Sequence, residues 1–187
     1  RDDLVTGVQT CALPICKKLR DGFGDDVLLF ETNGTDLPIH TFLINMYGAS
    51  YIAGSIASLF SYQAAVLAAN AQDLSIQRSI TGFSEGFIDN GGTSVSTCYI
   101  SDNHEGYSMQ ARAYELTDSL TETHRFIYPI AGGSNQGVYR YSRENPDKFY
   151  TAGMDVNLSA YSAHIVFSTV KHIDRAVAEF LFVFSFG

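Results

Sequence analysis

The sequence is poor in basic residues and contains no tryptophan. Its 187 residues include 12 lysines and arginines against 20 aspartates and glutamates, which gives a formal net charge of −8. The single basic run is Lys17–Arg20. A surface that follows a nucleic-acid backbone needs clustered lysines and arginines. The composition therefore argues against nucleic-acid binding.

Cysteine is also scarce, and two of the three cysteines lie in a segment that we do not interpret as protein sequence. Val5–Ile15 match, residue for residue, the first-frame translation of a common sequencing-library adapter, and Cys16 fits the junction. We therefore interpret residues 1–16 as an adapter-derived artefact and exclude them from fold reasoning. Cys98 then remains alone, which excludes a disulfide framework and a CxxC metal site.

Charge is absent from Thr41 to Gln72, which contain no aspartate, glutamate, lysine or arginine. A membrane-spanning helix needs about 20 predominantly apolar residues. This run is interrupted by Asn45, Gly48 and Gln63, among other small and polar residues. The pattern favours a buried helix of small residues followed by a core strand over a transmembrane helix.

Segments with the hydrophobic spacing of a helix alternate with short apolar runs along the remaining chain. Ile76, Ile80, Phe83 and Phe87 recur at helical spacing, and the pattern stops at two glycines. Short apolar runs that end in polar residues indicate strands. The expected strands are 25–32, 39–45, 64–70, 94–101, 124–131, 149–155 and 164–169, and the expected helices 47–61, 76–87, 109–120, 135–145 and 168–180. This alternation predicts an α/β fold with a parallel sheet and helices on both faces.

Polar residues gather where the expected strands end. In parallel α/β sheets, ligands bind beyond the carboxyl ends of the strands. The polar segments at those positions are 70–73, 101–106, 131–137, 154–157 and 168–171. We therefore expect the functional groups of this chain to lie in these segments.

Three features of these segments suggest a neutral ligand. The segment 131–137 contains two glycines but neither a phosphate-loop signature nor a basic residue, so it either brings the backbone close to a ligand or is only a tight turn. Asp155 can accept two hydrogen bonds from a vicinal diol, or it can cap a helix. Lys171 is expected in the first turn of a helix, where a cation opposes the helix dipole. That placement suggests a ligand or carboxylate partner, with a solvated lysine as the alternative.

Catalytic patterns were sought and not found. The sequence contains no nucleophile elbow, no HExxH pair and no paired catalytic carboxylates. We therefore expect no catalytic residue, no metal and no cofactor.

Five segments, in this order and spacing, carry a resemblance to a known family. They are "YGASYIAGSIAS", "SITGFSEGF", "FIYPIAGGSNQGVY", "AGMDVN" and "FSTVKHIDRAVAEF". The set resembles the basic membrane protein family, and the resemblance covers about Asp25 to Phe180. Its members are substrate-binding lipoproteins of ABC transporters, similar to a purine nucleoside receptor.

The resemblance implies a type I periplasmic-binding-protein fold with two parallel-sheet lobes, here incomplete at both ends. Residues 17–62 would be a remnant of the N-terminal lobe, 63–168 the C-terminal lobe and 169–187 a helix crossing back. The implied partners are a nucleoside, held between the lobes, and an ABC permease of the inner membrane. The implied location is extracytoplasmic, in the periplasm or at the cell surface, with a lipid anchor in the full-length protein.

The resemblance also implies the residues of the site. Carried over by position, the expected ligand contacts are Asp155 and Lys171 at the ribose, Gly133 in the close-packed loop, Tyr128 stacked on the base, and Asn70 or Asp73 near the base edge. Three alternatives remain open: a ligand-sensing regulatory domain of the same fold, a binding protein for another small solute, and an enzyme.

Overall fold

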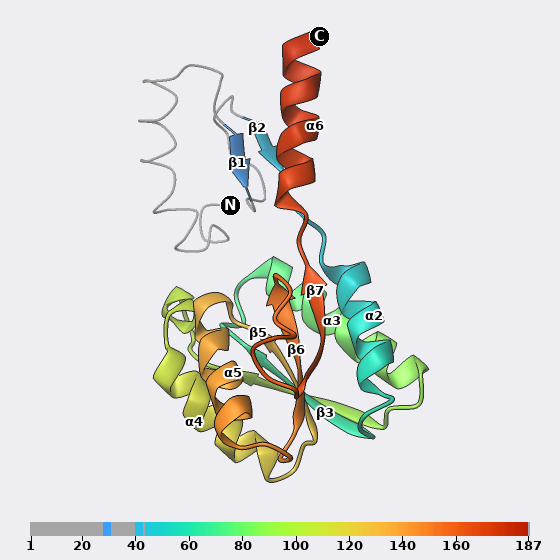
Figure 1. Cartoon of the computed structure of the whole chain (residues 1–187), viewed down its shortest axis with the longest axis vertical. Helices are drawn as coiled ribbons and strands as arrows, with labels where there is room; N and C mark the ends of the chain where they lie inside the picture. The colour runs from blue at the N-terminus through green and yellow to red at the C-terminus, as the bar shows by residue number, and fades with distance from the viewer. Residues whose placement is uncertain (1–27, 31–39, 43, 187) are drawn as a thin grey trace.

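The main body of the chain is one parallel sheet with helices on both faces. The computed structural model describes residues 28–30, 40–42 and 44–186 (Figure 1). Within them, five strands form a sheet in the order β4-β3-β5-β6-β7, and β1 and β2 form a separate parallel pair. The predicted α/β fold with a parallel sheet is confirmed.

Strands and helices alternate as expected, with small shifts at their ends. The strands are β1 (Leu28–Phe30), β2 (His40–Phe42), β3 (Gln63–Ala68), β4 (Ser94–Tyr99), β5 (Phe126–Ile130), β6 (Tyr150–Asp155) and β7 (Ile165–Val170). The α-helices are α2 (Tyr47–Ala57), α3 (Leu74–Asp89), α4 (Gln110–Thr121), α5 (Asn135–Glu144) and α6 (Ile173–Phe186). Two short 3₁₀ helices, η2 (His104–Tyr107) and η3 (Gly132–Ser134), follow β4 and β5.

The strand registers bring the carboxyl ends of the strands to one edge of the sheet. Ala68 at the end of β3 pairs with Tyr99 at the end of β4 and with Ile130 at the end of β5. Asp155 at the end of β6 pairs with Val170 at the end of β7. The polar segments that follow these strands therefore meet at this carboxyl edge, beyond which α6 projects (Figure 1).

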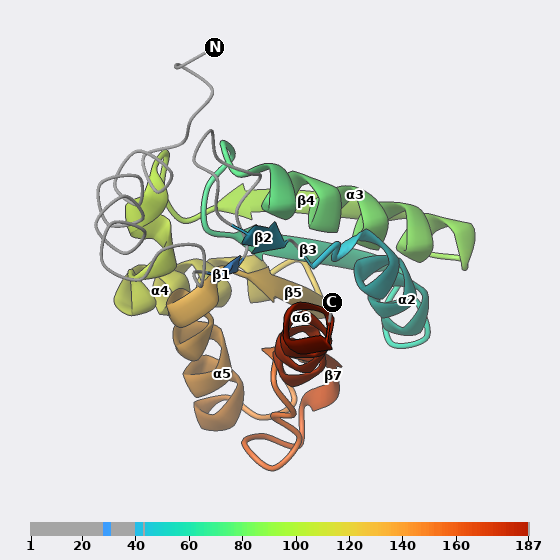
Figure 2. The same cartoon turned by 90° about the horizontal axis from the view of Figure 1, so that it is seen from above.

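Small residues allow α2 and α3 to pack in backbone contact on one face of the sheet (Figure 2). A Cβ atom on Gly86 would lie 2.0 Å from the carbonyl oxygen of Tyr51, and one on Gly54 would lie 2.1 Å from that of Phe83. The charge-free run thus divides into α2 and β3, as the sequence predicts. In the described ranges, no helix combines the length and the apolar character that crossing a bilayer requires.

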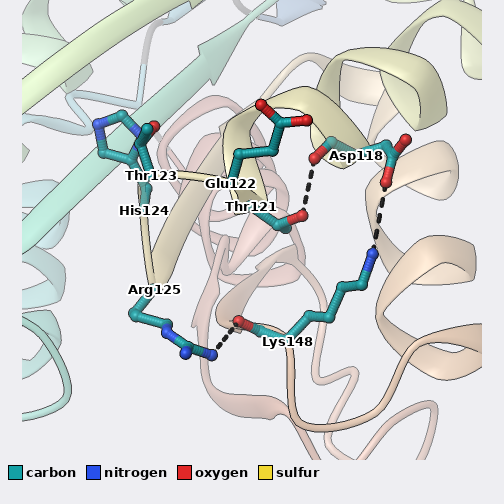
Figure 3. A pocket seen from close by; sticks show the side chains of 7 residues that line it. All are labelled: Asp118, Thr121, Glu122, Thr123, His124, Arg125 and Lys148. Atoms are coloured by element: carbon teal, nitrogen blue, oxygen red, sulfur yellow. Dashed lines mark hydrogen bonds and ion pairs between the residues drawn. The ribbon is translucent and has the colours of Figure 1, made fainter.

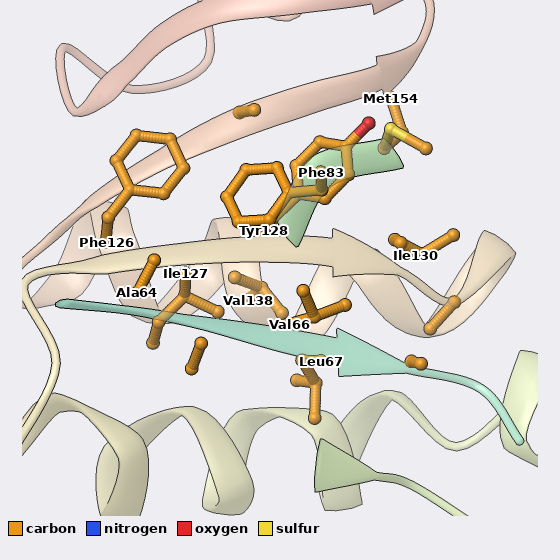
Figure 4. Close-up of a cluster of buried hydrophobic side chains, with 14 of the residues drawn as sticks. Ala64, Val66, Leu67, Phe83, Phe126, Ile127, Tyr128, Ile130, Val138 and Met154 are labelled. Atoms are coloured by element: carbon orange, nitrogen blue, oxygen red, sulfur yellow. The ribbon is translucent and has the colours of Figure 1, made fainter. Parts of the chain in front are cut away.

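The hydrophobic core lies around the two central strands. Every residue of β5 is buried, because helices cover both of its faces. Between the sheet and α3, the ring of Phe83 stacks on that of Tyr128, with centroids 4.4 Å apart (Figure 4). Phe126 continues this aromatic layer, 6.2 Å from Phe83.

The packing of α2 bears on the expected division of the chain. Ser50 of α2 lies with its Oγ 3.2 Å from the hydroxyl oxygen of Tyr128, and α2 packs along α3. This helix thus packs with the five-stranded sheet, and the division of the chain at residue 62 stays a prediction. The segment 1–16, which we interpreted as an artefact, lies outside the described residues.

Candidate functional site

An ion pair joins the ends of β6 and β7 at the carboxyl edge. The ammonium nitrogen of Lys171 lies 3.1 Å from Oδ1 of Asp155, and the Lys171 side chain is only 15% exposed. The backbone N–H of Lys171 also donates to the carbonyl of Asp155, at 3.1 Å. The structure therefore brings together the two residues that the sequence assigned to one ligand.

Asp155 holds an unusual backbone conformation. Its φ is 68°, in the left-handed region that residues other than glycine rarely adopt. Strained residues of this kind are concentrated at functional sites, where surrounding contacts hold them in place. Asp155 leads into the connection to β7 and not into a helix, so the capping alternative does not apply.

The position of Lys171 differs from the prediction. The helix α6 begins at Ile173, because β7 continues to Val170. Lys171 therefore lies between strand and helix, and the argument that it opposes a helix dipole in the first turn was wrong. The carboxylate partner that the argument required is nevertheless present, as Asp155.

Tyr128 is a core residue. Its side chain is fully buried, one ring face lies against Phe83, and its hydroxyl is within hydrogen-bond distance of Ser50. Burial raises the pKa of Tyr128, so the phenol stays protonated. A ring enclosed in this way cannot stack on a base, which contradicts the expected role of Tyr128.

The glycine-rich loop packs tightly on η2. Gly132 has a φ of 52°, and a Cβ there would lie 2.9 Å from the ring of Tyr107. At Gly133 a Cβ would lie 3.0 Å from the carbonyl oxygen of Tyr107. Ser134 fixes the contact, since its hydroxyl donates to the carbonyl of Gly106 at 2.7 Å. These glycines permit a close approach of two loops, and Gly133 remains exposed at the edge.

Asn70 and Asp73 differ in their free hydrogen-bonding capacity. Oδ1 of Asp73 accepts from the backbone N–H of Ser75 and caps α3, while its Oδ2 accepts from the hydroxyl of Tyr107 at 2.7 Å. Asn70 is fully buried, and its Oδ1 accepts from the backbone N–H groups of Gln72 and Asp73. Its amide nitrogen Nδ2 has no partner among the described residues. Asn70 therefore keeps one unused donor, whereas both carboxylate oxygens of Asp73 already accept hydrogen bonds.

Unpaired buried polar atoms are concentrated at this edge. Within the described part of the chain, Nδ2 of Asn70 and both ring nitrogens of His104 are buried and have no hydrogen-bond partner. Oδ1 of Asp155 accepts no hydrogen bond either, but it forms the ion pair with Lys171. Leaving such an atom unpaired costs about 1–3 kcal/mol. All three residues follow or end a strand of the sheet. The sequence placed the segment 101–106 here but did not single out His104.

A hollow lies at the opposite edge of the sheet (Figure 3). It measures about 370 Å³, and its lining residues are Asp118, Thr121, Glu122, Thr123, His124, Arg125 and Lys148. The ammonium of Lys148 lies 3.5 Å from Asp118, and the guanidinium of Arg125 donates to the carbonyl of Lys148. Because these charges already have partners, we assign this hollow no ligand.

The chain was compared with known families and proteins. A family model, Bmp, described as "ABC transporter substrate-binding protein PnrA-like", matches residues 32–183. No curated protein gives a significant match.

Solved structures share the fold at low sequence identity. An ABC transporter solute-binding protein from Aeropyrum pernix K1 is 17% identical, with a TM-score of 0.69, and the match covers 89% of this chain and 50% of that one. A transcriptional activator of the comK gene from Bacillus halodurans is 21% identical, with a TM-score of 0.62, over 92% and 66% of the two chains. A LacI family regulator from Enterococcus faecium, with bound ribose, is 15% identical, with a TM-score of 0.56, over 75% and 53%. The chain thus spans half to about two thirds of the length of these proteins.

Proposed function

Because this chain belongs to the Bmp family of PnrA-like ABC transporter substrate-binding proteins, we propose that it is the solute-binding component of an ABC transporter and binds a purine nucleoside. The family is one of solute-binding proteins and not an enzyme class. The proposed partners are the nucleoside and an ABC permease of the inner membrane. The proposed location is extracytoplasmic, with a lipid anchor on the full-length protein.

The pair formed by Asp155 and Lys171 is the observation that carries this proposal. A carboxylate accepts hydrogen bonds from both hydroxyls of a ribose, and an ammonium donates to a sugar oxygen. Hydrogen bonds to charged groups contribute about 1.5–3 kcal/mol each. The pair lies at the edge where parallel α/β sheets bind ligands, and it combines one acceptor group and one donor group at a single point.

The arrangement of the strand ends supports a ligand longer than a sugar. Asn70 follows β3, and β3 is separated from β6 by β5 alone. Two strand spacings amount to roughly 10 Å. A ribose at Asp155 does not fill that distance, whereas a ribose joined to a base does. The unpaired amide of Asn70 would then donate to the base edge, and Gly133 would let the loop backbone approach the ligand.

The fold suggests how binding is related to transport. Two-lobed binding proteins close around their ligand by a hinge movement. We propose that the nucleoside lies between the sheet described here and a second lobe, and that closure signals occupancy to the permease.

Calorimetric titration of the protein expressed from the complete reading frame tests this function. Inosine, guanosine, adenosine and ribose are titrated separately. The proposal predicts binding of at least one purine nucleoside, and weaker binding of ribose, which lacks the base. If ribose binds as tightly as the nucleosides, the ligand is a sugar and the nucleoside assignment is wrong.

A regulatory domain is the second candidate, because transcriptional regulators share this fold. The complete reading frame separates the two functions. A secretion signal with a lipid-modified cysteine would support transport, and a helix-turn-helix would support regulation.

A further inference from the structure

The end of α3 carries a dipeptide that can modify itself, because Asn90, which caps the helix, is followed by Gly91. The backbone nitrogen of a glycine can attack Cγ of a preceding asparagine, since glycine has no side chain to hinder the approach. The proton of that nitrogen leaves with the side-chain amide as ammonia, and a five-membered succinimide ring remains. Water then opens the ring at either carbonyl and produces an aspartate or an isoaspartate. Asn90 and Gly91 are both exposed, so water reaches them.

The backbone at the end of α3 holds the attacking nitrogen away from the side chain. The N–H of Gly91 donates to the carbonyl of Ile88 at 3.2 Å. The N–H of Gly92 donates to the carbonyl of Phe87 at 2.9 Å, and these two bonds form a Schellman motif. The ψ of Asn90 is 21°, which places the nitrogen of Gly91 beside the backbone nitrogen of Asn90 and away from its Cβ. The ring can close only after rotation about the Cα–C bond of Asn90, and this rotation takes Gly91 out of the motif.

The amide group that the reaction expels is held by α2. Nδ2 of Asn90 donates to Oγ of Ser55 and to the carbonyl of Gly86, both at 2.9 Å. The hydroxyl of Ser58 donates to the carbonyl of Asn90 at 3.0 Å, so Asn90 ties the end of α3 to α2. A carboxylate in its place has no hydrogen to donate, and it adds a negative charge at the C-terminal end of a helix, which the helix dipole disfavours. The product of the reaction therefore cannot restore the tie.

We propose that Asn90–Gly91 is a site of spontaneous deamidation that the fold protects, and that its modification permanently loosens the end of α3 from α2. The Schellman motif and the contact with Ser55 provide the protection, because both must open before the ring closes. The amount of product thus increases with the time that this end of the helix spends open. The site is separate from the proposed ligand site, because α3 begins after β3 and ends before β4, at the edge opposite Asp155.

Incubation of the protein expressed from the complete reading frame, in native buffer and in urea at the same pH, tests the protection. Peptide mapping by mass spectrometry measures the product at each asparagine. In urea, the same dipeptide at Asn33–Gly34 gives an internal reference, and the two sites should react at similar rates. In native buffer, Asn90 should react at least about tenfold more slowly than in urea, since the open state is a minor population. Equal rates at Asn90 in the two conditions would overturn the proposal.

Ser55→Ala tests the role of α2, because it removes one of the two acceptors of the Asn90 amide. The native rate at Asn90 should rise by about threefold or more, while the rate in urea stays that of the wild type. Ser119→Ala is the control, since this exposed hydroxyl bonds only to the carbonyl of Glu115 in its own helix. It should change neither rate. An unchanged native rate in Ser55→Ala, or an equal rise in Ser119→Ala, would overturn the assigned role of the contact.

Asn145 is the matched control for the consequence of the modification. It caps α5, and its Nδ2 also donates to a carbonyl four residues earlier, that of Tyr141, at 3.2 Å. Pro146 follows it and has no N–H, so Asn145 should stay unmodified in both conditions. Asn90→Asp, which reproduces one product, should lower the melting temperature more than Asn145→Asp, because Asn90 also donates to Ser55. An equal or smaller decrease in Asn90→Asp would overturn the proposed loosening of α3.

Discussion

The side chains of Asp155 and Lys171 meet at 3.1 Å, although sixteen positions separate them in the chain. They come from the ends of the neighbouring parallel strands β6 and β7, whose register pairs Asp155 with Val170, the residue before Lys171. The backbone of Asp155 lies in the left-handed region, and the Lys171 side chain is only 15% exposed.

Lys171→Met should weaken nucleoside binding by about tenfold or more, because the ammonium donor to the sugar is lost. The free energy of unfolding should fall by about 1 kcal/mol or less, since the Asp155 side chain as a whole is 46% exposed. Titration calorimetry and urea unfolding measure the two quantities.

Lys148→Met serves as the control for that prediction. Lys148 pairs with Asp118 at 3.5 Å, both side chains are half-exposed or more, and the pair lies at the opposite edge. Its loss should leave binding unchanged. A loss of binding in Lys148→Met equal to that in Lys171→Met would show that net charge, and not the site, controls affinity.

Buried tyrosines should make the protein unstable at high pH. Burial raises the pKa values of Tyr128 and Tyr139 above the ordinary value of 10.0. The unfolded chain therefore releases these protons at lower pH than the folded chain does. The stability that the two phenols contribute is fully present below pH 10.0 and decreases as the pH rises toward their folded pKa values.

Urea unfolding at pH 8 to 11, for the wild type and for Tyr128→Phe, checks this expectation. The Tyr128→Phe variant should lose less stability at alkaline pH than the wild type does. The control Tyr62→Phe, at an exposed position, should lose as much stability as the wild type. Because Tyr128 is a core residue, Tyr128→Phe should also bind inosine as the wild type does. A tenfold loss of inosine affinity in Tyr128→Phe would show that Tyr128 contributes to ligand binding.

Gly86→Ala should destabilise the protein by about 1–3 kcal/mol, because the new methyl group forces α3 away from α2. Its Cβ would lie 2.0 Å from a backbone oxygen that cannot move independently of α2. Gly48→Ala, in α2 itself, meets no atom within 4 Å and should stabilise the helix by about 0.5–1 kcal/mol. Thermal unfolding compares the two variants, and equal effects would contradict the close packing of these helices.

The sequence was sufficient to predict the sheet and its polar edge. Strand-length apolar runs alternate with helical periods, and parallel strands bring their carboxyl ends together, so Asp155 and Lys171 could be assigned to one place before any coordinates. Lys171 was still misplaced by one element, because the polar residues Ser168 and Thr169 belong to β7 and give no sign of where the strand ends.

The errors at Tyr128 and His104 have a common physical origin. A strand buried on both faces has no alternation of polar and apolar residues, so the sequence does not reveal that Tyr128 faces the helix layer. His104 was overlooked because its distinguishing property, a buried ring without hydrogen bonds, depends on the packing of η2 against β3. The spacing of residue types along the sequence does not predict that contact.

The ribose hydroxyls of the ligand and the carboxylate of Asp155 should contribute jointly to the binding affinity. Measuring this coupling tests the central claim most directly. Inosine and 2′,3′-dideoxyinosine are titrated into the wild-type chain and into Asp155→Asn, an isosteric change that tolerates a positive φ. The account predicts that the wild type prefers inosine by about tenfold or more and that the variant loses this preference. The same preference in both proteins would show that Asp155 does not bind the sugar.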